Sequence, residues 1–320
     1  MHLEQFDRGD KQHVLVALSL WNAACGPDLA VSQRGLEFNL RPCAGAMHDG
    51  RIIYAEGRAV GFALASSLRD DPETSSPGSG WIDAIAVHPD ARGSGAGTAL
   101  LAWAEGWARE QGCPKVMLGA SLRPWVHGLP AALGSDGFFL RRGYLPGPHR
   151  ARSWDMAHRL TEYEAPVTAR RSLPITVLPG KQGQEEALVA YHRREFPGRW
   201  HDELKEYLSE GGRISDYMIL WSERGIDGVC RLTFEDSERP LDRFYPHRLP
   251  HPWAQLGSIG VSADCRGKGY GAVLLDAGLR RLRDCGVDGC IIDWTGLLDF
   301  YGQFGFKPYR EYLMLSKSLN

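Results

Sequence analysis

Two glycine-rich loops are the parts of this sequence best suited to chemistry. Residues 92–97 read Arg-Gly-Ser-Gly-Ala-Gly, and residues 266–271 read Arg-Gly-Lys-Gly-Tyr-Gly. Glycines let the backbone turn tightly, so that consecutive N–H groups and the start of a following helix point at one anion. Such a nest can hold a diphosphate. A tight turn without a ligand would explain one such loop, but two matched copies favour a pair of phosphate sites.

Other nucleotide-binding loops fit these residues less well. A P-loop would end in Gly-Lys followed by Ser or Thr, which neither copy does. A Rossmann fingerprint would read Gly-x-Gly-x-x-Gly, whereas the glycines here alternate as Gly-x-Gly-x-Gly.

The elements that must position these loops are also repeated. An apolar, strand-like run precedes each loop, at residues 81–87 and 256–261, and a helical pattern follows it, at 100–108 and 274–282. A second strand and an aromatic segment come next in each copy, and helices and hairpins lie upstream. Each half therefore reads β, α, β, β, β, α, β, α, β. This order predicts an α/β fold in each half and leaves the order of the strands in each sheet open.

The chain of 320 residues is long enough for two domains. Residues 161–173 carry charges and little apolar periodicity, which suits a linker. We therefore expect domains at 1–160 and 174–320. The first half has a longer connection at 122–136, interpreted as an inserted loop.

The loops resemble those of the GNAT acetyltransferases, whose hallmark is Gln/Arg-x-x-Gly-x-Gly/Ala between a strand and a helix. Arg92, Gly95 and Gly97 match it in the first half, and Arg266, Gly269 and Gly271 match it in the second. An aromatic pair before a Gly-Phe turn is the second family signature, and Phe300-Tyr301 before Gly305-Phe306 matches it. The resemblance implies two tandem GNAT folds.

The resemblance also implies that acetyl-CoA is the co-substrate. The loop amides would hold its pyrophosphate, and the strand before each loop would bind the pantetheine arm. The residues expected to bind it are Ile85, Ala86, Val87, Arg92, Gly93, Ser94, Gly95, Ala96, Gly97 and Thr98 in the first half, and Ile259, Gly260, Val261, Arg266, Gly267, Lys268, Gly269, Tyr270, Gly271 and Ala272 in the second.

Acetyl transfer to an amine requires a neutral amine and a proton for the departing thiolate. The resemblance gives the second role to Tyr301, as general acid. Phe139 stands at the matching place in the first half and has no proton to give, so we expect catalysis in the second half. Asp83, on the strand before the first loop, is a candidate base or a solvated edge residue. In the second half the base is left open between water, Asp293 and Asp299.

Composition bears on partners and location. The formal net charge of −2 gives no general attraction to nucleic acid or anionic lipid, and no apolar run approaches the length of a membrane span. We expect a cytoplasmic enzyme acting on a small-molecule or peptide amine, with no nucleic acid, membrane or metal partner. His247 and His251 are read as incidental histidines of a proline-rich loop.

Two alternatives stay open. The chain could be a non-catalytic CoA-binding regulatory or scaffold protein, or it could use a longer acyl-CoA. Substrate contacts are expected among side chains of the first helices and last strands of the second half: Tyr191, Phe196, Trp200, His201, Tyr207, Tyr309, Glu311 and Tyr312.

Overall fold

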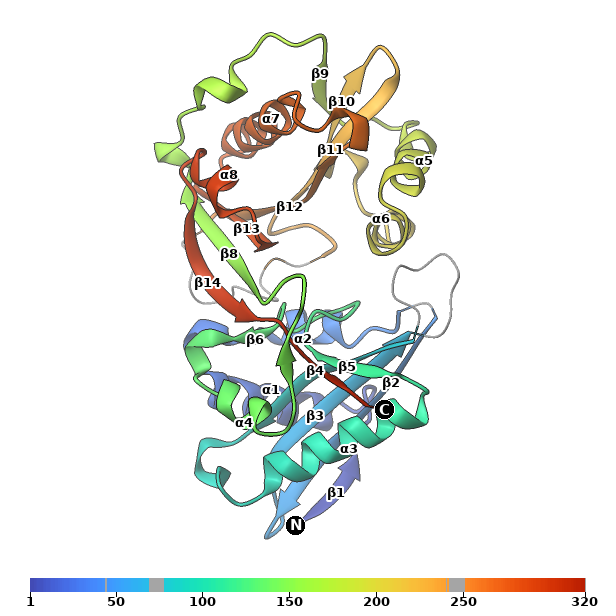
Figure 1. The fold of residues 1–320 in the computed structure, drawn as a ribbon, viewed down its shortest axis with the longest axis vertical. Helices are drawn as coiled ribbons and strands as arrows, with labels where there is room; N and C mark the ends of the chain where they lie inside the picture. The colour runs from blue at the N-terminus through green and yellow to red at the C-terminus, as the bar shows by residue number, and fades with distance from the viewer. Residues whose placement is uncertain (44, 69–77, 240, 242–250, 320) are drawn as a thin grey trace.

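The computed structural model describes residues 1–43, 45–68, 78–239, 241 and 251–319. It contains two mixed sheets, stacked along the long axis of the molecule, with helices on both faces of each (Figure 1). Both chain termini lie in the lobe built on the first sheet (Figure 1). None of the helices described is long and apolar enough to cross a membrane.

The first sheet has the strand order β1-β2-β3-β4-β5-β15-β7. Its strands are β1 (His2–Gln5), β2 (Ala46–Ala55), β3 (Arg58–Leu68), β4 (Ser79–Val87), β5 (Lys115–Leu118), β7 (Leu145–Pro146) and β15 (Leu315–Ser318). The helices of this half are α1 (Lys11–Cys25), α2 (Gln33–Asn39), α3 (Ala96–Glu110) and α4 (Asp136–Leu140). Leu20 of α1 and Leu36 of α2 share a buried cluster with Phe62 of β3, whereas Leu101 of α3 packs against Ile82 in a separate cluster.

The second sheet has the order β6-β14-β8-β13-β12-β11-β10-β9. Its strands are β6 (Leu129–Pro130), β8 (Arg152–Arg159), β9 (Thr176–Pro179), β10 (Tyr217–Ser222), β11 (Gly225–Thr233), β12 (Trp253–Val261), β13 (Gly289–Thr295) and β14 (Lys307–Leu313). Its helices are α5 (Glu185–Glu195), α6 (Arg199–Ser209), α7 (Tyr270–Asp284) and α8 (Leu298–Gly302).

Helices cover the two faces of the second sheet through separate cores. Leu274 and Leu279 of α7 pack with Leu256 of β12 in one cluster. Leu188 of α5 and Leu204 of α6 pack with β10 and β11 in another. Alternation of side chains along the strands directs successive residues to these two opposite faces.

The two halves exchange strands. β8 precedes the expected linker in sequence, yet it pairs with β13 and β14 of the second sheet. β15, near the end of the chain, returns to the first sheet and pairs with β5 and β7. Figure 1 shows β8 and β14 side by side where the two lobes meet. The sheets therefore do not follow the division of the sequence into residues 1–160 and 174–320. As a statement about domains, that division stays a prediction.

The connection at 122–136 is part of the interior between the lobes. Residues 123–130 are buried throughout, and β6 within this segment pairs with Tyr312 and Leu313 of β14. Trp125 packs on the first half, with its ring centroid 5.2 Å from that of Trp21 and 5.6 Å from that of Phe62. This segment, residues 122–130, is called the interlobe segment below.

The predicted α/β class with two copies of one element order is confirmed. The helical stretch upstream of the second loop is two helices, α5 and α6, because Pro197 and Gly198 interrupt it. Gly198 has a φ of 85°, a left-handed conformation that glycine adopts without strain.

Candidate active site

Both glycine loops have the conformation that their sequences predict. Gly93 and Gly95 have φ values of 81° and 93°, and Gly267 and Gly269 have φ values of 76° and 91°. Gly95 and Gly269 are the N-cap residues of α3 and α7, and neither cap carries a side-chain hydrogen bond. The first N–H groups of α7 are therefore left for an anion, as are those of α3 after Ala96, whose own N–H donates to Ser94 Oγ at 3.4 Å.

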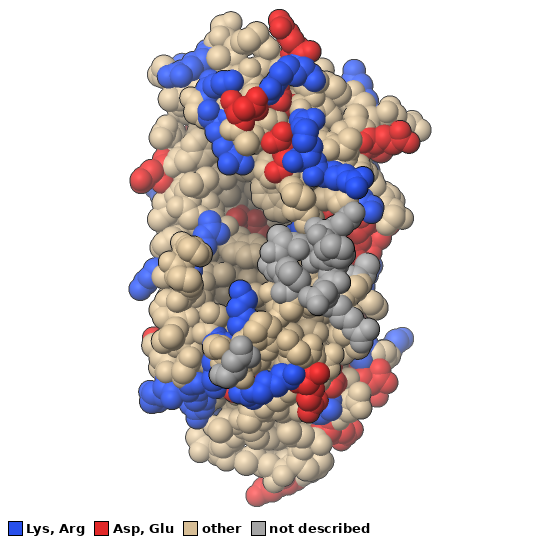
Figure 2. Space-filling view, turned by 45° about the vertical axis from the view of Figure 1, so that its right-hand side comes forward, with Lys and Arg blue, Asp and Glu red and all other residues tan. Residues whose placement is uncertain are grey.

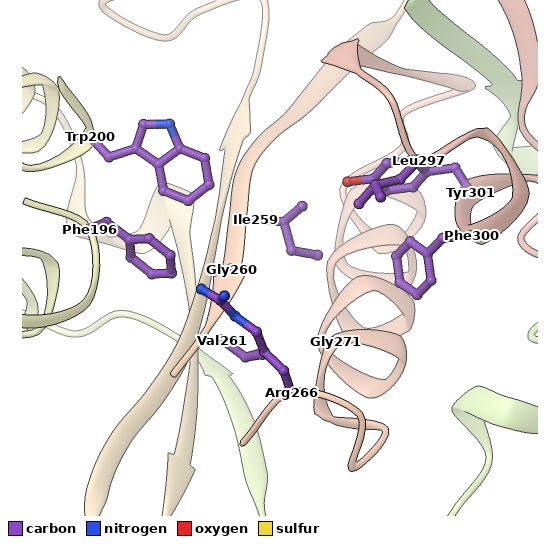
Figure 3. A pocket seen from close by; sticks show the side chains of 10 residues that line it. All are labelled: Phe196, Trp200, Ile259, Gly260, Val261, Arg266, Gly271, Leu297, Phe300 and Tyr301. Carbon is purple, nitrogen blue, oxygen red and sulfur yellow. The ribbon is translucent and has the colours of Figure 1, made fainter. Parts of the chain in front are cut away.

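The second loop borders a cavity of about 320 Å³. Its walls are the end of β12, the start of α7, the turn before α8 and α8 itself, and the junction of α5 and α6. The lining residues are Phe196, Trp200, Ile259, Gly260, Val261, Arg266, Gly271, Leu297, Phe300 and Tyr301. Figure 3 shows Arg266 reaching from the loop toward Gly260, with Phe196 and Trp200 on the opposite wall from Phe300 and Tyr301.

The cavity exists because two parallel strands diverge. β12 pairs with β13 only from Trp253 to Gln255, after which the two strands separate. Ser258 and Trp294, one on each strand, have φ values of 47° and 48°, which mark the irregular backbone at the opening. Positive φ is uncommon for residues other than glycine and concentrates at functional sites. The backbone groups of β12 that face β13 beyond Gln255 can therefore form hydrogen bonds with a bound ligand.

Tyr301 lies at the inner end of this cavity. The residue is 4% exposed, belongs to the α7 side of the core, and turns its hydroxyl toward the cavity in Figure 3. Burial, and then the negative charge of Asp293, raise the pKa of Tyr301 well above its ordinary value of 10.0. The phenol is therefore a protonated group at neutral pH.

Asp293 lies on the other side of the opening. Its neighbour in β13, Ile292, packs into the α7 core, so the Asp293 side chain points to the opposite face of the sheet. Its Oδ1 atom is 3.5 Å from where a Cβ on Gly257 would stand, and Gln255 Nε2 is 3.7 Å from the same point. A carboxylate and a phenol therefore flank the gap between β12 and β13.

Charged side chains lie near Asp293 on the face of the sheet that α6 covers. Burial alone would raise the pKa of Glu203, but Arg199, Arg239 and Arg231 outweigh burial and hold it well below its ordinary value. Arg231, itself 7% exposed, faces Glu203 at 3.8 Å. Figure 2 shows the molecule hollowed midway along its length, with acidic side chains at the bottom of the hollow.

The first half differs at the equivalent positions. A Cβ on Gly97 would lie 3.5 Å from Phe138, and the Arg142 guanidinium sits 3.8 Å from the centroid of that ring. Arg142 also donates to Thr98 Oγ1 at 2.8 Å, and Arg92 donates to the carbonyl of Ala24 at 2.8 Å. These contacts pair loop side chains with other groups of the protein at its surface. Phe139, the counterpart of Tyr301, is buried and carries no proton to donate.

Asp83 is enclosed by the first half. It is 5% exposed, accepts a hydrogen bond from Ser66 Oγ at 2.7 Å, and faces Arg8 at 3.9 Å. Burial raises the pKa of Asp83 to about 6, although Arg8 and the hydroxyl groups of Ser66 and Ser121 oppose the rise. The edge-solvated reading of this residue does not fit its burial.

Comparison with known proteins identifies the family. The model of the Acetyltransferase (GNAT) family matches the chain twice, over residues 19–127 and 185–306. The chain belongs to the GNAT acetyltransferases. It is an N-acetyltransferase, and enzymes of this family use acetyl-CoA. The repeat in the sequence thus corresponds to two GNAT units.

This GNAT enzyme has curated relatives of similar length. A mycothiol acetyltransferase of Nocardiopsis dassonvillei is 28% identical over 303 residues, covering 82% of this chain and 80% of the relative. A mycothiol acetyltransferase of Actinosynnema mirum is 27% identical over 282 residues, covering 86% and 85%.

Solved structures share the fold. A GCN5-related glucosamine N-acetyltransferase region of a fungal multi-domain GH3 β-N-acetylglucosaminidase superposes with a TM-score of 0.85 at 22% identity. The match covers 98% of this chain but only 38% of that one, so this chain corresponds to one region of the fungal protein. A tandem GNAT protein from the clavulanic acid biosynthesis pathway superposes with a TM-score of 0.71 at 15% identity, covering 100% and 99%.

The side chains expected to contact substrate fall into three groups in this GNAT enzyme. Phe196 and Trp200 line the cavity. Glu311 is paired with Arg152 away from it. The rest are wholly or partly buried side chains outside the cavity lining, namely Tyr191, His201, Tyr207, Tyr309 and Tyr312. Asp299 is exposed on α8, and His247 lies outside the described residues.

Sequence reasoning missed one residue beside the site. His127 of the interlobe segment has its Nε2 atom 2.9 Å from Asp293 Oδ2. The two residues are far apart in sequence, and no repeat or motif links them. The only available signal was the unusual length of the connection at 122–136 in the first half.

Proposed function

We propose that the second half transfers an acetyl group from acetyl-CoA to a primary amine of a small molecule, with Tyr301 as general acid and Asp293 as general base. The observation that carries this proposal is the placement of Tyr301 and Asp293 on the two sides of the gap between β12 and β13. The cavity that leads to this gap begins at the glycine loop.

The residues of the cavity divide the work of binding. The N–H groups at the start of α7, together with Arg266 at the mouth of the cavity, suit the pyrophosphate of acetyl-CoA. The open edge of β12 at Ile259–Val261 suits the amide groups of the pantetheine arm. The thioester would then lie between Tyr301 and Asp293, where β12 N–H groups can stabilise the oxygen charge that develops on attack.

Asp293 is preferred over Asp299 as base because of its position. Asp299 is exposed on α8, whereas Asp293 borders the gap opposite Tyr301. An acid and a base on opposite sides of the reacting carbonyl serve the two proton transfers that the reaction requires. Asp83 stays a prediction for the first half, which lacks a matching proton donor.

The acceptor is proposed to be the amine of an amino sugar or a similarly polar molecule. The gap opens onto buried arginine and glutamate side chains, which suit hydroxyl-rich ligands more than apolar ones. The names of the relatives, mycothiol acetyltransferase and glucosamine N-acetyltransferase, support this class. A peptide amine, a longer acyl donor and a non-catalytic CoA-binding role are the competing outcomes.

Calorimetry with acetyl-CoA tests the assignment of halves. A glutamate in either nest should repel the pyrophosphate from that half, so Gly271→Glu is expected to abolish the binding that supports turnover. Gly97→Glu is the matched control. Retained turnover in Gly271→Glu would refute a catalytic second half.

Turnover tests the reaction itself. A panel of glucosamine, a diamine and a short peptide is incubated with acetyl-CoA, and free thiol is measured. Acetylation of glucosamine in preference to the peptide supports the proposal. Binding of acetyl-CoA without turnover of any amine would favour the non-catalytic role.

A further inference from the structure

We infer that His127 is a positioning residue for Asp293, so that the first half of the chain supplies part of the active site of the second. This inference rests on the proposed function, in which Asp293 is the base. It assigns a role to the interlobe segment, which the family signatures do not include.

His127 is held in one place by its surroundings. The residue is 2% exposed, its ring is stacked on Trp294 with centroids 5.3 Å apart, and it meets the Tyr312 ring nearly at a right angle with centroids 5.8 Å apart. Asp155 of β8 accepts hydrogen bonds from the Tyr312 hydroxyl at 2.7 Å and from the Trp294 backbone N–H at 3.1 Å. The histidine therefore packs between residues that are themselves fixed.

This arrangement orients the Asp293 carboxylate. His127 Nε2 lies 2.9 Å from Oδ2, while Oδ1 faces Gly257 and Gln255 at the gap between the strands. A histidine bound to one carboxylate oxygen fixes the rotation of the group and leaves the other oxygen for substrate. Such support is what keeps a reacting group within its productive geometry.

Other charged groups around Asp293 do not duplicate this contact. Arg231 approaches from β11, and its pKa is raised because Tyr217, Glu203 and Asp293 outweigh burial. Tyr301 faces it from α8. Burial raises the pKa of Asp155 of β8, which interacts with both His127 and Asp293. A direct hydrogen-bonding distance to Oδ2 is shown for His127.

The proposed step moves one proton to Asp293. The acceptor ammonium gives a proton to Oδ1, directly or through water, and the neutral amine then attacks the thioester carbon. A C–N bond forms, the C–S bond breaks, and the thiolate takes the Tyr301 proton. The second amine proton passes to solvent as the amide forms. Tyr301 then takes a proton from solvent and Asp293 releases one to it, so that one proton is released for each acetyl group transferred.

The interlobe segment holds His127 in position through contacts with both lobes. Trp125, two residues earlier, is anchored in the first half by Trp21 and Phe62. Arg123 of the same segment is paired with Glu206 of α6 in the second half. The segment therefore bridges the lobes, and the position of His127 depends on both.

The test measures steady-state kinetics of the full chain with acetyl-CoA and glucosamine, or the best amine of the panel. His127→Ala is expected to lower kcat about tenfold or more with little change in the KM of acetyl-CoA, because the base loses its orientation and not its substrate. His127→Gln, which keeps a donor, should recover part of the loss. Val126→Ala is the matched control, since Val126 is buried in the same segment and packs on the first half.

A double-mutant cycle separates positioning from general damage. If His127 acts through Asp293, then His127→Ala should change kcat by less than about twofold in an Asp293→Asn background. The acidic limb of kcat/KM should also move to higher pH in His127→Ala, because the carboxylate loses a donor that favours its charged form.

Three results overturn the inference. One is full activity in His127→Ala; another is the same fold-loss in both backgrounds; the third is an equal loss in Val126→Ala. Full activity in Asp293→Asn would remove the base assignment as well. Failure of the wild type to acetylate any amine of the panel would instead refute the proposed function, so the two failures are distinguishable.

Discussion

The Phe196 ring lies directly over Gly260, so that a Cβ at Gly260 would overlap it. Both residues line the cavity. Gly260→Ala is therefore expected to push Phe196 from its place and weaken acetyl-CoA binding about tenfold, which calorimetry can measure. Gly106→Ala in α3, where a Cβ meets no atom within 4 Å, is the control and should bind normally. Unchanged affinity in Gly260→Ala would argue against this cavity as the acetyl-CoA site.

Replacement of Tyr301 by Phe should lower kcat by about 10² to 10⁴ while leaving the KM values near those of the wild type. Burial and the charge of Asp293 raise the pKa of this phenol, so its proton persists to higher pH than in water. Ionisation of Tyr301 should therefore cause no loss of the wild-type rate at pH values up to about 9.

Tyr163→Phe is the matched control for Tyr301→Phe. The Tyr163 hydroxyl donates to Asp276 at 2.6 Å, outside the cavity. Loss of this bond should lower the free energy of unfolding by about 1 kcal/mol while kcat is kept. A comparable drop in kcat for both variants would show that Tyr301 contributes packing and no proton.

Asp83 predicts a pH dependence of stability. Its folded pKa of about 6 exceeds its unfolded value of 3.8, so the folded state binds the proton more tightly. The stability that protonation contributes is present at low pH and is lost as pH rises through 6. Asp83→Asn does not titrate here, so it should not lose this stability. Its free energy of unfolding minus that of the wild type should thus be about 1 kcal/mol larger at pH 7.5 than at pH 5. Denaturant titrations at the two pH values measure this difference, and a pH-independent difference would contradict the burial argument.

The strand exchange predicts how fragments of the chain behave. Residues 174–320 alone lack β8, which β13 and β14 require, and residues 1–173 alone lack β15. Each fragment expressed by itself should aggregate, because a strand that pairs on both sides is missing and two strand edges are exposed. Co-expression of both fragments should give a complex that co-purifies and binds acetyl-CoA. Stable, separately folded fragments would contradict the exchange.

Local patterns predicted the parts of this enzyme that are local. The glycine loops at 92–97 and 266–271, the helices after them and the pair Phe300-Tyr301 each depend on residues close in sequence. They form because of a tight turn, a helix cap and a hydrophobic helix face, and each of these can be recognised from the spacing of residues alone. The positive φ values of Gly95 and Gly269 follow directly from this pattern.

The remaining features depend on contacts between distant residues. Nothing in the composition of β8 or β15 indicates which sheet each joins, since each is a short run in which buried and exposed residues are mixed. Asp293 could not be separated from Asp299 by sequence, because the difference is burial beside the gap in the sheet. His127 stood in a segment interpreted as an insertion, and only the fold brings it to Asp293.

The exchange of β8 and β15 also bears on how such a protein can change over generations. Two copies of one unit would ordinarily be free to separate, recombine with other domains or be lost singly. Here each copy completes the sheet of the other, so neither can be transferred to a new gene as an independent module. The first copy, which has Phe139 where the second has Tyr301, can diverge further while the copy itself stays indispensable.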